Sequence, residues 1–277
     1  MTGMTEASYR KLFDLTGRTA LVTGACGILG RRFAAGLAEF GADLALVDLE
    51  AEPAAAVAAE ISRRHGVKAL GVACDVADPD AVRRMSETVE SRLGSVRILM
   101  NNAATKGRDL DAFFAPIERY DLKTWRDIMA VNLDGMFLVA QTLGGRMAEN
   151  GGGSIIQTAS IYGLMAPDQR IYAGSEYNGR PINTPAVYSA SKAGVIGLTR
   201  HLATAWAERG VRVNTLTPGG VSSGQNSEFS RRYSARVPLG RMAEADDMVG
   251  AAIFLASDAS RYMTGQNIIV DGGLSAW

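Results

Sequence analysis

Tyr188 and Lys192, four positions apart, are the residues of this chain best suited to moving a proton. They fall in a segment predicted to be a helix, 188–208, and residues four apart lie on one face of a helix. A free phenol has a pKa of about 10, and a neighbouring cation favours the phenolate. We therefore expect Lys192 to lower the pKa of Tyr188 toward neutrality and make it a general acid or base. An exposed tyrosine beside a solvated lysine is the alternative.

Length and composition indicate one large α/β domain. The chain has 277 residues, 47% of them apolar, and 29 basic residues balance 29 acidic ones. Because these charges balance, the chain has no net positive charge that would attract nucleic acid or an anionic membrane. The N-terminus lacks a secretory pattern, and no 18-residue apolar stretch occurs. Cys26 and Cys74 are predicted to be reduced thiols, and His65 and His201 stand at no metal-ligand spacing. We expect a cytoplasmic protein with no metal, nucleic-acid or membrane partner.

Short strands rich in Val, Ile and Leu alternate with longer segments of helical periodicity. This alternation predicts a doubly wound parallel sheet, the Rossmann fold, with helices on both faces. The predicted strands are 19–23, 43–48, 68–73, 96–100, 154–158, 211–215 and 267–270. The predicted helices are 28–40, 52–65, 79–93, 123–148, 188–208 and 244–256.

The chain shows no linker, repeat or break in composition, so we predict a single domain, 16–277, after an extension, 1–15. Two connections are longer than the fold needs: 104–122 after the fourth strand and 164–187 before the Tyr188 helix. Both begin at the carboxyl ends of strands, where such sheets bind ligands. Long loops in that position favour a role in substrate binding.

Three glycines follow the first strand and open the next helix. Such a turn lets the backbone approach a pyrophosphate at a helix N-terminus. Asp48 ends the second strand, where its carboxylate would accept hydrogen bonds from the adenosine ribose and repel a 2′-phosphate. NAD is therefore favoured over NADP, unless Arg31 or Arg32 neutralises that phosphate rather than lying exposed on the first helix. The glycines are Gly24, Gly27 and Gly30.

Further motifs follow in a fixed order along the chain. They are Asp75-Val76 after the third strand, Asn101-Asn-Ala-Ala104 after the fourth, Asn132 in a helix, Ser160 after the fifth strand, Pro218-Gly219 after the sixth, and the closing segment Thr264–Gly273. With these motifs the chain resembles the short-chain dehydrogenase/reductase family from about Thr16 to Gly273.

The resemblance implies a role for each matching residue. Tyr188 and Lys192 would be catalytic and contact the cofactor, Ser160 would bind the reacting oxygen, and Asn132 would hold a water that relays protons from Lys192. Asp75 and Val76 would contact the adenine. The remaining cofactor-binding positions would be Asn101 and Ala103 near the adenosine ribose, and Pro218, Gly219, Val221 and Ser223 near the nicotinamide.

Two departures from the family pattern stand out. The glycines at 24, 27 and 30 follow TGxxGxxG rather than the commoner TGxxxGxG, so Ile28 stands where the backbone is usually bare. We expect dinucleotide binding to persist through Gly27. The separation of Ser160 and Tyr188, 28 residues, is about twice the usual one. The extra segment is predicted to be a lid, with Arg170 or Arg180 pairing a substrate carboxylate or phosphate. A surface excursion or subunit contact is the alternative.

The predicted activity is NAD(P)-dependent interconversion of a secondary alcohol and a ketone. The polar insertion favours a small-molecule substrate such as a sugar, polyol or sugar acid. Phe113 and Phe114 keep open a lipophilic ketone, a steroid or a 3-oxoacyl thioester. A protein that senses NAD(H) without turnover is the alternative from another class. The resemblance also implies a homotetramer with Trp277 in an interface.

Overall fold

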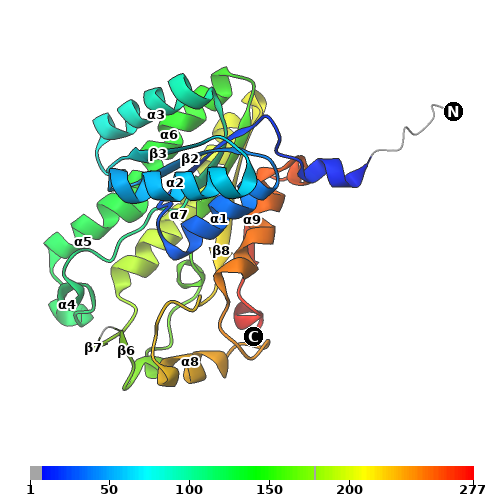
Figure 1. The fold of residues 1–277 in the computed structure, drawn as a ribbon. Helices are drawn as coiled ribbons and strands as arrows, with labels where there is room; N and C mark the ends of the chain where they lie inside the picture. The colour runs from blue at the N-terminus through cyan, green and yellow to red at the C-terminus, as the bar shows by residue number, and fades with distance from the viewer. Residues whose placement is uncertain (1–7, 178) are drawn as a thin grey trace.

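A single seven-stranded parallel sheet organises the chain. The computed structural model describes residues 8–177 and 179–277, and the strand order is β3-β2-β1-β4-β5-β8-β9. Helices cover both faces (Figure 1). The sheet consists of β1 Thr19–Thr23, β2 Asp43–Asp48, β3 Ala69–Ala73, β4 Val96–Asn101, β5 Gly153–Thr158, β8 Val211–Pro218 and β9 Asn267–Val270. The predicted doubly wound fold is confirmed.

The helices begin and end where local chemistry dictates. In α3, for example, the Asp78 side chain accepts from the backbone N–H of Asp80, Pro79 occupies the first turn, and Gly94 ends the helix with a φ of 83°. The helices are α1 Ile28–Glu39, α2 Ala51–His65, α3 Pro79–Leu93, α4 Leu110–Phe113, α5 Leu122–Met129, α6 Met136–Glu149, α7 Ala186–Trp206, α8 Ser227–Ser234 and α9 Val249–Ala256.

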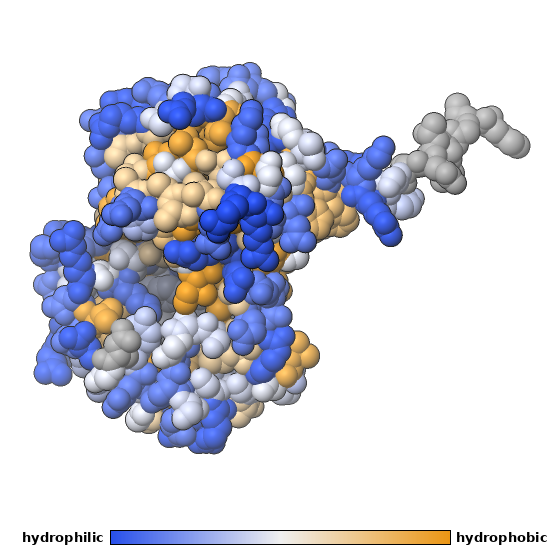
Figure 2. All heavy atoms as spheres, viewed as in Figure 1, coloured by the Kyte–Doolittle hydropathy of each residue, from blue (hydrophilic) through white to orange (hydrophobic). Residues whose placement is uncertain are grey.

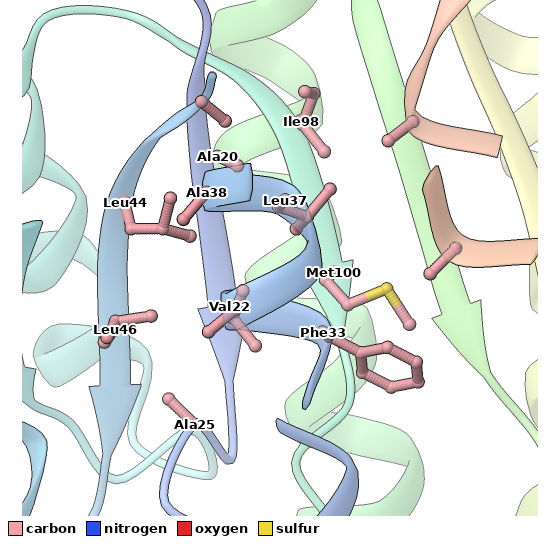
Figure 3. Close-up of a cluster of buried hydrophobic side chains, with 14 of the residues drawn as sticks. Ala20, Val22, Ala25, Phe33, Leu37, Ala38, Leu44, Leu46, Ile98 and Met100 are labelled. Atoms are coloured by element: carbon pink, nitrogen blue, oxygen red, sulfur yellow. The ribbon is translucent and has the colours of Figure 1, made fainter. Parts of the chain in front are cut away.

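Two apolar layers, one on each face of the sheet, form the core. On one face α1, α2 and α9 pack against the strands, with Phe33 and Leu37 of α1 directed at β1, β2 and β4 (Figure 3). On the other face α3, α6 and α7 bury Met85, Leu143 and Trp206. The first layer also includes Leu15, the last residue of the predicted extension, which is fully buried.

One predicted helix, 123–148, has three parts in the structure. Between α5 and α6 lies a π-helical turn, Ala130–Gly135, that contains Asn132. Such turns occur preferentially at functional sites. By length and composition alone, Leu122–Glu149 would be apolar enough to cross a membrane. In the fold, Val139 and Leu143 of this run are buried in the layer shared with α3 and α7, which accounts for its apolar character.

The two predicted insertions lie at the carboxyl edge of the sheet. The segment 104–122 contains α4, and 164–187 contains a small antiparallel pair, β6 Glu176–Tyr177 with β7 Arg180–Pro181. In Figure 1 this pair lies below the sheet beside α8, a short helix that the sequence did not predict. Tyr172 stacks on Phe229 of α8, with ring centroids 5.4 Å apart. The insertion and α8 therefore form one packed unit.

Candidate active site

A cavity of about 740 Å³ opens between the carboxyl edge of the sheet and this unit. Figure 2 shows the hollow on this face of the molecule. The cavity brings together most of the residues that the sequence predicted for a site. Those that line it are Gly24, Gly27, Asp48, Ser160, Tyr188, Lys192, Pro218, Gly219, Val221 and Ser223.

Six predicted site residues do not line the cavity: Gly30, Asp75, Val76, Asn101, Ala103 and Asn132. Asn101 lies at the end of β4, behind the cavity wall. Its carboxamide is buried inside the sheet, where it accepts from Thr23 Oγ1 and donates to Met136 O at 2.8 Å and to Gln157 Oε1 at 2.9 Å. Its neighbour Asn102 lines the cavity instead. The Asn101 side chain therefore holds the sheet edge together, and a position near the adenosine ribose stays a prediction for this residue.

The glycine turn at the nucleotide end fits a dinucleotide. Gly24 has a φ of 64°, and a Cβ on Gly30 would stand 2.0 Å from Gly24 O, so the turn itself excludes larger residues. Ile28 is 53% exposed, so the shifted glycine spacing causes no crowding. The buried hydroxyl of Thr158 also lines the cavity without a hydrogen-bond partner among the described residues. These features match a pyrophosphate at the N-terminus of α1 and a polar cofactor group near β5.

Asp48 is held at the wall of the cavity by backbone donors. Its carboxylate accepts from Cys26 N and from Leu49 N, each at 2.8 Å. The two nearby arginines have partners of their own, because Arg31 donates to Cys26 O and Arg32 pairs with Asp246 at 3.3 Å. Of the residues that line this end of the cavity, Asp48 is the charged one among those described.

Lys192 is buried and Tyr188 is half-buried at the chemical end of the cavity. Lys192 Nζ donates to Thr158 O at 2.9 Å, and burial lowers the pKa of this lysine to about 8. Burial raises the pKa of Tyr188, against a smaller lowering by the nearby Ser160 hydroxyl. The expectation that Lys192 would lower the pKa of Tyr188 is therefore wrong for the protein without cofactor. Desolvation of the phenolate outweighs the ammonium, which is directed at the β5 carbonyl.

Ser160 and Asn132 are fixed by backbone contacts. Ser160 Oγ accepts from Tyr162 N at 3.3 Å at the start of a short 3-10 turn. Asn132 is fully buried, its Oδ1 accepts from Thr105 N at 2.7 Å, and its Nδ2 donates to Thr105 O at 3.3 Å. Asn132 thus holds the loop after β4, a contact that the sequence did not predict.

The insertion 164–187 forms one wall of the cavity, but not through its arginines. Arg170 pairs with Asp168 and its side chain is 91% exposed, while Arg180 pairs with Asp111 at 2.9 Å. Neither lines the cavity, so the predicted arginine contacts with substrate are wrong. The segment instead contributes Tyr172, Tyr177, Ile182, Asn183, Thr184 and Pro185.

Lys106, Gln225 and Tyr233 are among the other cavity-wall residues that sequence reasoning missed. A lone lysine just after the Asn101–Ala104 motif could have pointed to Lys106. Gln225 donates to Ser223 Oγ at 2.9 Å, and Tyr233 OH accepts from Gly220 N at 2.5 Å. Both side chains hold the loop that follows β8.

Comparison with known proteins agrees with this geometry. A family model described as enoyl-(acyl carrier protein) reductase matches residues 24–275. D-threitol dehydrogenase of Mycolicibacterium smegmatis is 39% identical over 99% of this chain and 98% of its own length. Gluconate 5-dehydrogenase of Gluconobacter oxydans is 34% identical over 97% and 98%. Among solved structures, a gluconate 5-dehydrogenase from Burkholderia cenocepacia in complex with NADP and tartrate matches with a TM-score of 0.84, at 36% identity over 96% of this chain and 98% of that one.

The chain belongs to the short-chain dehydrogenase/reductase family. As a member it is an oxidoreductase that uses a pyridine nucleotide and acts on CH–OH groups. The predicted family and activity are confirmed. In this dehydrogenase Tyr188, Lys192 and the glycine turn line the same cavity.

The lowered pKa of Lys192 predicts a pH-dependent stability for the dehydrogenase without cofactor. Between pH 8 and the ordinary lysine value of 10.5, the unfolded chain binds more protons than the folded one. The free energy of unfolding should therefore rise with pH across this window, by up to roughly 3 kcal/mol from this group. In the Lys192→Met variant, the free energy of unfolding should not show this rise with pH. Denaturant titrations of both proteins at several pH values test it, and an identical pH dependence would refute the assigned burial.

Proposed function

We propose that this dehydrogenase interconverts a secondary alcohol and a ketone on a polyol, sugar or sugar acid. The convergence of Ser160, Tyr188 and Lys192 in one cavity carries the proposal. Hydroxyl and amide groups of Tyr162, Tyr172, Asn183, Thr184 and Gln225 also line that cavity and suit a hydroxyl-rich substrate. The similarity to the threitol and gluconate dehydrogenases supports the same substrate class.

Each side chain has a defined task in this reaction. Nicotinamide, when bound, supplies or accepts the hydride. Tyr188 gives a proton to the carbonyl oxygen in reduction and takes one from the alcohol in oxidation. Ser160 donates a hydrogen bond to the same oxygen, where charge develops. Because burial raises the pKa of Tyr188, the phenol is protonated at neutral pH, and a protonated phenol suits reduction. Oxidation needs the phenolate as a base, so the rate of oxidation should increase as pH rises.

The central test of this function is Tyr188→Phe. Loss of the acid–base group should lower kcat/KM by about 10²- to 10⁴-fold, while the variant still binds the cofactor. The assay follows nicotinamide absorbance over a panel of threitol, glucitol, galactitol and gluconate. Tyr262→Phe, which alters a fully exposed phenol, is the control. Full activity of Tyr188→Phe would rule out the proposed role.

For the cofactor, we propose NAD over NADP. Asp48 supports this choice, since its carboxylate would repel a 2′-phosphate, and the charge of Arg32 is paired with Asp246. The Burkholderia cenocepacia relative was solved with NADP, so the preference requires a direct test.

Asp48→Ser should weaken the preference for NAD on the order of 10-fold, because it removes the repelling charge from the cavity wall. The ratio of kcat/KM with NAD to that with NADP measures it. Glu50→Gln is a matched control, since Glu50 is exposed, lies near the same turn and does not line the cavity. A wild-type protein that already prefers NADP would overturn the proposal.

A 3-oxoacyl thioester or another lipophilic ketone is the second candidate substrate. Phe113 and Phe114 pack edge to face in the cavity wall, with ring centroids 5.0 Å apart, and the matching family model carries an acyl-carrier-protein description. Acetoacetyl-CoA in the same panel distinguishes the two. Cofactor binding without turnover of any compound would favour an NAD(H) sensor.

We also propose a cytoplasmic homotetramer. Trp277 is 80% exposed and Leu239 is 70% exposed, and association would cover such apolar surface. Light scattering at micromolar concentration should give four times the chain mass of 29.3 kDa. A monomer would contradict the assembly.

A further inference from the structure

Lys106 has a fixed place in the wall of the cavity, five residues beyond the end of β4. The residue before it, Thr105, is held at both its backbone N–H and its carbonyl by the Asn132 carboxamide. The residue after it, Gly107, donates its N–H to Thr105 Oγ1 at 2.9 Å and has a φ of 75°. The backbone therefore presents this lysine in one orientation.

The side chain of Lys106 joins the two insertions. Its Nζ lies 4.3 Å from the centroid of the Tyr177 ring in β6, a cation–π contact. Asn183 Nδ2 donates to Phe114 O at 2.6 Å and ties the same two segments together. Tyr177, Asn183 and Phe114 all line the cavity. The Lys106 ammonium therefore lies in the cavity wall, at the place where the two insertions meet.

The charges around the cavity leave Lys106 uncompensated. Among the described residues that line it, only Asp48, Lys106 and Lys192 are charged. Asp48 is bound to the glycine turn, and the Lys192 ammonium is bound to Thr158 O. No carboxylate pairs with Lys106 within residues 8–177 and 179–277. Lys106 is exposed, yet desolvation by the surrounding wall lowers its pKa, and a bound anion would reverse that effect.

We propose that Lys106 binds the carboxylate of the substrate, which makes a sugar acid, rather than a neutral polyol, the preferred substrate. This inference rests on the proposed function and narrows it to one class. An ammonium exposed to the cavity and free of acidic neighbours recognises a carboxylate through charge-assisted hydrogen bonds. A neutral polyol gives it only hydroxyl oxygens.

Matched substrate pairs test the inference. Each pair joins an aldonate with the alditol of the same chain: gluconate with glucitol, galactonate with galactitol, and threonate with threitol. In the best pair the wild-type kcat/KM should be higher for the acid. Lys106→Met should lower the acid's kcat/KM by on the order of 10- to 100-fold, mainly through KM, and lower the polyol's by much less. Lys106→Arg should retain most of the preference, and Lys68→Met, the same change at an exposed site, should alter neither.

Two results would overturn the inference while leaving the proposed function intact. One is an equal loss for acid and polyol in Lys106→Met, and the other is a wild-type preference for the polyol in every pair. If no compound is oxidised although cofactor binds, the proposed function itself fails. The anion site is then judged by calorimetry with saturating NAD, and a gluconate Kd that is the same in wild type and Lys106→Met would overturn it.

Discussion

The bond from Lys192 Nζ to Thr158 O is the interaction on which the rest of the site depends. A buried ammonium is costly unless it is bonded, so this contact ties α7 firmly to the end of β5. The chain after β5 packs directly on α7 at the same point, since a Cβ on Gly163 would stand 2.6 Å from the carbonyl carbon of Lys192. Ser160 begins that turn and Tyr188 lies one helical turn before Lys192. The same contact that anchors the helix therefore brings the Ser160 and Tyr188 side chains into one cavity.

Burial also sets the direction in which the pKa values of Lys192 and Tyr188 shift. It lowers the pKa of Lys192 and raises that of Tyr188, so both groups tend toward their neutral forms. A protonated phenol held in place beside a serine hydroxyl is ready to donate to a carbonyl. The reverse reaction requires a phenolate, which the surroundings must stabilise or an alkaline solution must supply.

Sequence reasoning was strongest where the information is local. Apolar runs and glycine-terminated helices placed the sheet strands within a few residues, and the motifs pointed to Ser160, Tyr188 and Lys192, which line one cavity. It was weaker where a contact joins distant segments. Asn101 and Asn102 differ by one position, yet the first is bonded to Gln157 inside the sheet and the second faces the cavity. Arg170 and Arg180 had suitable chemistry, but nearby carboxylates, Asp168 and Asp111, hold them outside. Helix α8 is short and polar, and it depends on packing against Tyr172 that no local pattern reveals.

The most direct measurement is a crystal structure of the wild-type dehydrogenase with NADH and an alcohol substrate, a complex that cannot turn over. The alcohol oxygen should lie within roughly 2.6–3.2 Å of both Tyr188 Oη and Ser160 Oγ. That oxygen bound elsewhere in the cavity, out of hydrogen-bonding reach of both side chains, would show that Tyr188 is not the acid–base group.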